Sequence, residues 1–165
     1  MKFSNTIPIT KNTGFNYNEY SFHKFNEIGS QNAYNSHNKI YIDDDNMFIA
    51  GTSSLRDVVQ DWVKIPLHLT SKTQRYQDAE KVLQHNPQIT NLYGHSLGSS
   101  VAFELEKNRP DLTVWAAYAT PTISGTKSRS NNRFKHPYDP FASLDSGAEI
   151  HPNKQGYDQH TYKNY

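Results

Sequence analysis

Apolar residues in the middle of the chain recur with the period of strands in some stretches and of helices in others. Residues 39–43 and 47–50 are rich in apolar side chains and flank an Asp-Asp-Asn turn, which predicts a β-hairpin. Apolar residues at helical spacing predict helices at residues 54–62 and near residues 76–83. Residues 112–119 are almost continuously apolar, as is typical of a parallel strand covered on both faces.

A glycine-rich turn with a central serine lies between these elements. It is Gly94-His95-Ser96-Leu97-Gly98, after a short predicted strand at residues 89–93 and before a predicted helix at residues 96–108. A serine at such an apex needs a strained backbone to expose its hydroxyl, and neighbours two positions away must lack a Cβ. Gly94 and Gly98 meet this requirement, so the pattern predicts a nucleophile elbow with Ser96 as the nucleophile. The alternative is an ordinary glycine-rich turn from strand to helix.

The alternation of strands and helices predicts an α/β fold of three layers with a short, central, mostly parallel sheet. The length of 165 residues fits one domain, which we place at residues 39–165. Residues 1–38 show no sustained period of either kind, so we expect a peripheral N-terminal segment with one short helix near residues 20–28. A docking arm for a protein partner is the alternative role of this segment.

Composition excludes several classes of function. The net charge of +1 provides no overall field for binding nucleic acid or an anionic membrane. The absence of cysteine excludes disulfides and thiolate metal sites. No apolar run has transmembrane length, and the N-terminus lacks the apolar segment of a signal peptide. We therefore expect a protein that is cytoplasmic or that belongs to a larger particle such as a virion.

A nucleophilic serine needs a base to take its proton and an acid to hold that base. Asp139 follows the short extended stretch at residues 133–136, so we expect it at the carboxyl end of a strand, with Asp145 as the alternative. Asp111 falls in a helix-to-strand turn, at the other end of the sheet. The base is one of the later histidines, which are His136, His151 and His160.

The remaining ionisable residues predict no cofactor. His95, inside the elbow, is expected to pack or to form a hydrogen bond, because its position directs it away from the serine. The late histidines and Asp158 lack the compact spacing of a metal site, so we expect no metal and no cofactor. A polar, basic stretch at residues 124–135 is predicted to be a solvated loop, with a phosphate head group as its alternative contact.

Two motifs of this chain resemble the class 3 lipases, the fungal triacylglycerol lipase-like α/β-hydrolases. They are Ile49-Ala50-Gly51-Thr52-Ser53-Ser54-Leu55-Arg56-Asp57 followed by Asp61, and the Gly-His-Ser-Leu-Gly elbow. The resemblance extends over residues 40–165 and implies an α/β-hydrolase-like fold. It also implies Ser96 as nucleophile, Asp139 in Tyr-Asp-Pro as the acid, and His160 as the base.

The resemblance and the helix dipole point to the same oxyanion hole. Leu97 offers its backbone N–H at the start of the elbow helix, and Thr52 offers its N–H and its hydroxyl. The alternative for Thr52 is a helix cap. In class 3 lipases the helix that corresponds to residues 54–62 is a lid, but its four apolar residues here fit core packing equally well.

The expected function is hydrolysis of a lipid or other acyl ester, dispersed or with short chains, with only transient contact with a membrane. The alternative is a structural or particle-associated protein that retains an inactive hydrolase fold.

Overall fold

The computed structural model describes residues 17–52, 73–118, 120, 133–135 and 149–150 of the chain. Its elements are α1 (Tyr17–Asn35), β1 (Ile40–Asp43), β2 (Asn46–Ile49), α3 (Gln74–His85), β3 (Asn91–His95), α4 (Leu97–Asn108), β4 (Thr113–Tyr118), β5 (Arg133–Lys135) and β6 (Glu149–Ile150). The strands form a six-stranded sheet in the order β1-β2-β3-β4-β5-β6. β1 and β2 are antiparallel, and each later neighbouring pair is parallel. The chain therefore belongs to the α/β class, with the mostly parallel sheet that was predicted.

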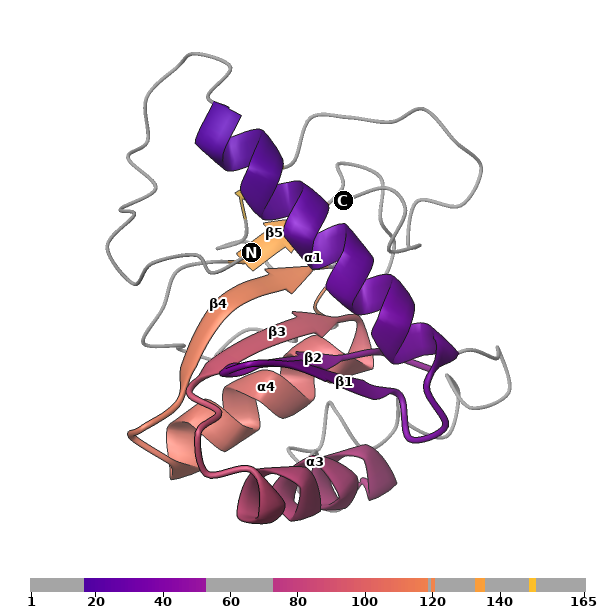
Figure 1. The fold of residues 1–165 in the computed structure, drawn as a ribbon, viewed down its shortest axis with the longest axis vertical. Helices are drawn as coiled ribbons and strands as arrows, with labels where there is room; N and C mark the ends of the chain where they lie inside the picture. The colour runs from indigo at the N-terminus through magenta and orange to yellow at the C-terminus, as the bar shows by residue number, and fades with distance from the viewer. Residues whose placement is uncertain (1–16, 53–72, 119, 121–132, 136–148, 151–165) are drawn as a thin grey trace.

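Helices cover both faces of the sheet (Figure 1). α1 crosses one face over β1, β2 and β3, while α4 packs against the other face and α3 packs against α4. Because strand side chains alternate between faces, each face builds its own core. The core under α3 and α4 is mainly aliphatic and includes Met47, Ile49, Leu92, Val101, Leu105 and Val114. The core under α1, here called the aromatic cluster, contains the rings of Phe22, Phe25, Tyr34, Tyr41, Phe48, Tyr93, Trp115, Tyr118 and Phe134.

α1 corrects the expectation of one short helix near residues 20–28. It has 19 residues and forms a layer of the fold. Its buried positions follow a helical spacing, and they are Phe22, Asn26, Gly29, Ser30 and Ala33. Most of these side chains are small or polar, so a search for an apolar period does not detect them. Gly29 allows the close approach of the helix, since a Cβ there would overlap the Phe48 ring.

Most other predicted elements are confirmed, with small shifts at their ends. The hairpin, α3, α4 and β4 lie where the pattern predicts them. β3 starts two residues later than expected and continues to His95. The short strand β6 was not expected, because the segment after residue 136 was predicted to consist of loops. Its two residues are too few to show a period.

β4 holds one extra residue relative to β3. Trp115 lies between two paired positions and has no partner on β3, which is the arrangement of a β-bulge. Trp115 and Ala116 consequently both contribute to the core under α1. The Trp115 Nε1 donates to Asn91 Oδ1 at 2.8 Å, which satisfies a buried amide at the start of β3. Beyond the bulge, Tyr118 lies opposite His95, so the end of β4 runs beside the residue that precedes the elbow serine.

Tyr93 makes the stability of the fold sensitive to alkaline pH. It stacks on Phe48 with ring centroids 4.7 Å apart. Burial, with a smaller contribution from the Asp45 charge, raises the pKa of Tyr93 above its ordinary value of 10.0. The folded state therefore keeps a proton that the unfolded chain releases above that pH. The free energy of unfolding falls as pH rises further, by up to about 1.4 kcal/mol per pH unit.

We expect Tyr93→Phe to reduce this alkaline loss, because phenylalanine has no proton to release. Urea unfolding between roughly pH 8 and pH 11 measures the effect as the slope of the free energy of unfolding against pH. Tyr41→Phe is the control, since Tyr41 is half-buried in the same aromatic cluster. A slope unchanged by Tyr93→Phe would contradict the prediction.

Candidate active site

Ser96 occupies the sharp turn that joins β3 to α4. Its backbone has φ 54° and ψ −127°, so a residue with a Cβ adopts a positive φ here. Such a conformation is strained and persists only when the surroundings hold it in place. The Ser96 N–H donates to the Tyr118 carbonyl at 2.9 Å, and the Ser96 carbonyl accepts from the Ser99 N–H at 2.9 Å. The Ser99 hydroxyl donates to the same Tyr118 carbonyl at 2.9 Å. The end of β4 and the first turn of α4 thus fix the serine turn.

Gly94 and Gly98 occupy the two positions of the predicted elbow where a residue without a Cβ is needed, because other backbone atoms approach closely there. A Cβ at Gly94 would lie 2.5 Å from the Ser99 Cα, inside the first turn of α4. A Cβ at Gly98 would overlap the carbonyl of Ile49 at the end of β2. Both obstacles are backbone atoms, which cannot move aside as a flexible side chain does. These two glycines therefore allow the helix after the serine to pack directly on the strand ends.

The turn after β2 lies against the elbow serine. A Cβ placed on Gly51 would be 2.7 Å from the Ser96 Cβ, so Gly51 and Ser96 are in direct contact. Thr52 follows and is half-buried. Arg75 fixes the residue that precedes Gly51, because its guanidinium donates to the Ala50 carbonyl at 2.8 Å. The structure thus brings the segment that contains Thr52 beside the serine.

Leu97 is the first residue of α4, and it is buried. Backbone N–H groups in the first turn of a helix have no intrahelical acceptor, and they lie at the positive end of the helix dipole. The Leu97 N–H is one of these groups and directly follows Ser96. The two backbone segments proposed for the oxyanion hole therefore meet at one edge of the sheet.

His95 is a buried hydrogen-bonding residue in the structure. It ends β3, and 2% of its surface is exposed. Its Nδ1 lies 2.6 Å from the Tyr34 hydroxyl, and the two rings contact edge to face with centroids 5.6 Å apart. His95 thus links the elbow to α1.

The predicted acid and base, Asp139 and His160, lie outside the described residues, as do the alternatives Asp145 and His151 and the helix at residues 54–62. The strands that lead towards them are described. β5 ends at Lys135 and β6 ends at Ile150, and both are parallel to β3 and β4. The carboxyl ends of parallel strands meet at one edge of a sheet, so β5 and β6 both end at the edge where Ser96 lies.

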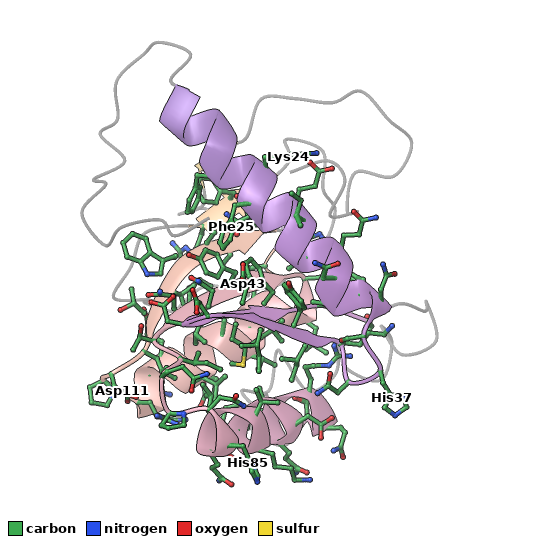
Figure 2. All side chains as sticks on the ribbon, in the orientation of Figure 1. Lys24, Phe25, His37, Asp43, His85 and Asp111 are labelled. Atoms are coloured by element: carbon green, nitrogen blue, oxygen red, sulfur yellow. The ribbon has the colours of Figure 1, made fainter. Side chains whose placement is uncertain are left out.

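Asp111 is excluded as the acid by its position. It precedes β4, at the end of the sheet opposite the serine, as Figure 2 shows by its label beside the start of β4. Its carboxylate pairs with the Arg109 guanidinium at 2.7 Å. This pair raises the pKa of Arg109, chiefly through the hydrogen bond to Asp111.

Two further findings concern metal ions and membranes. Across the described ranges, no group of three or more His, Asp or Glu side chains is arranged to hold a metal ion. None of the helices in the part of the chain that the structure describes is long and apolar enough to cross a membrane.

Sequence reasoning did not identify two residues that support the elbow. They are Tyr34 and Arg75, which reach the elbow and the turn after β2 from α1 and α3. Tyr34 is 61 positions away from His95 along the chain, and no local pattern connects them. Comparisons with protein-family models, curated protein sequences and solved structures find no match to this chain.

Proposed function

We propose that this chain is a serine acyl-ester hydrolase with an α/β-hydrolase-like fold. The observation that supports the proposal best is the strained backbone of Ser96 between a buried parallel strand and a helix, flanked by two glycines that close packing requires. A positive φ alone is not specific, because Lys39 and Asp44 adopt it in other turns of this chain. Its combination with a strand before the serine, a helix after it and a glycine two positions away on either side is the arrangement of a nucleophile elbow, which presents the hydroxyl above the end of the sheet. The resemblance to class 3 lipases supports the same assignment.

In the proposed mechanism the Ser96 Oγ attacks the ester carbonyl carbon, and His160 takes the hydroxyl proton. Asp139 orients His160 and stabilises its charged form. The N–H groups of Leu97 and Thr52, with the Thr52 hydroxyl, stabilise the negative charge on the carbonyl oxygen. The tetrahedral intermediate collapses, and the alcohol leaves with the proton from His160. Water, deprotonated by His160, then attacks the acyl-enzyme, which releases the carboxylic acid and regenerates Ser96.

A fluorophosphonate probe tests this proposal, because it reacts only with an activated serine. We expect labelling of the full chain at Ser96, located by mass spectrometry of the labelled peptide. With p-nitrophenyl esters of increasing chain length, we expect higher rates on short or dispersed substrates and no sharp rise when the substrate aggregates. Absence of labelling and of turnover would favour the alternative, a structural or particle-associated protein with an inactive hydrolase fold.

Thr52→Val tests the oxyanion hole. Valine keeps the branched shape and the backbone N–H of threonine but lacks the hydroxyl that donates to the developing oxyanion. We expect kcat to fall roughly ten- to a hundredfold, because a fixed donor to the transition state is lost. We expect the Tm to stay close to that of the wild type, since Thr52 is half-buried. An unchanged kcat would leave Thr52 with a capping role only.

A further inference from the structure

Tyr34 stands out among the polar groups that the proposed mechanism does not use, and it is half-buried. It lies in the last turns of α1, far from Ser96 in the sequence, and its hydroxyl contacts two different parts of the candidate site. It accepts a hydrogen bond from the Gly51 N–H at 3.2 Å, and it lies 2.6 Å from His95 Nδ1. One oxygen atom therefore connects the turn that precedes Thr52 with the residue that precedes Ser96.

The Tyr34 hydroxyl is itself held by a rigid support. α1 packs tightly on the sheet, with the Phe25 ring edge-on to Phe48 at 5.2 Å and to Tyr93 at 5.6 Å. Figure 2 labels Phe25 between α1 and the sheet. The carbonyl of Tyr34 accepts from the Lys39 ammonium at 2.6 Å, which ties the end of α1 to the start of β1. The part of α1 that carries Tyr34 is thus held against the sheet.

We infer that Tyr34 is a positioning residue of the proposed oxyanion hole, an inference that rests on the proposed function. An oxyanion hole works only if its donors are fixed before the charge develops. The donors here belong to two separate segments, the turn after β2 and the start of α4. The Tyr34 hydroxyl holds both segments by their adjacent residues, Gly51 and His95, and so fixes the distance between the Thr52 and Leu97 N–H groups. Tyr34 does not touch the substrate.

Tyr34→Phe tests the inference, because it removes the hydroxyl and keeps the ring that packs on His95. We expect kcat to fall roughly ten- to a hundredfold, since small displacements of positioned groups have effects of this size. We expect KM to stay within about twofold, because the acyl-binding surface is unchanged and only transition-state stabilisation is lost. The concentration of active sites is measured with the fluorophosphonate probe in a separate sample. The kcat is then calculated per molecule that the probe can label, so unfolded protein does not lower it.

Tyr41→Phe is the matched control, since it removes a hydroxyl from the same aromatic cluster at a position on β1 opposite Phe48. It should retain wild-type kcat and KM. A kcat per labelled site that Tyr34→Phe leaves unchanged, or a loss confined to KM, would overturn the inference while the labelled serine still supports the proposed function. A wild-type protein that the probe does not label would overturn the proposed function and the inference with it.

Discussion

Ser96→Ala is expected to remove fluorophosphonate labelling and to lower ester turnover by roughly 10³- to 10⁶-fold, as loss of the nucleophile does in other serine triads. Alanine keeps the Cβ that contacts Gly51 and keeps every backbone hydrogen bond of the turn. The fold should therefore persist, with a Tm near that of the wild type. Labelling, turnover of a short p-nitrophenyl ester and thermal unfolding measure the three quantities.

Ser100→Ala is the matched control for this experiment. Ser100 lies one turn into the same helix and is buried, and its hydroxyl has no hydrogen-bond partner among the described residues. Its loss should leave labelling and turnover unchanged. If Ser96→Ala retains labelling at wild-type rates, Ser96 is not the nucleophile.

Gly98→Ala is expected to lower turnover roughly a hundredfold or more and to destabilise the fold by about 1–3 kcal/mol. The added methyl group would overlap the Ile49 carbonyl, which is part of the sheet and cannot rotate away. Alanine favours a helix over glycine by about 0.5–1 kcal/mol, which offsets only part of this cost. α4 must therefore shift away from β2, and the Leu97 N–H moves with it.

Urea unfolding and the rate of fluorophosphonate labelling measure both effects. Lys107→Ala serves as the control, because it also places alanine on α4 but at an exposed position, paired only loosely with Glu104 at 4.0 Å. It should change the free energy of unfolding by less than about 0.5 kcal/mol. Normal labelling and stability in Gly98→Ala would show that α4 does not need its close approach to β2.

The predictable part of the fold is the part where period and boundary signals agree. α3 shows this agreement: its apolar residues follow the helical period, Thr73 caps its N-terminus by accepting from the Tyr76 N–H at 3.2 Å, and an Asn-Pro pair follows its end. α1 lacks such agreement, because Asn26, Gly29 and Ser30 form much of its buried face. Close packing against an aromatic surface favours small residues, and small residues have a weak apolar period.

The candidate site likewise has one part that the sequence predicts and another part that it does not. The backbone conformation of Ser96 follows from its neighbours, since Gly94 and Gly98 are spaced as an elbow requires. Gly51 contacts Ser96, and the Tyr34 hydroxyl on α1 contacts Gly51 and His95. These contacts arise because strands far apart in the chain pair with one another. Contacts of this kind depend on strand order and register, which no local pattern encodes.

α1 precedes the strands on which it packs, and this order affects synthesis. Phe22 contacts Tyr93 with ring centroids 6.4 Å apart, and Phe25 contacts both Phe48 and Tyr93. The helix leaves the ribosome before these partners, so its aromatic residues lack their complete native surface until both β2 and β3 have been made. Exposed apolar rings on a nascent chain favour aggregation. Polar residues elsewhere on α1, including the exposed Lys24 and Gln31, limit the apolar area presented during this interval.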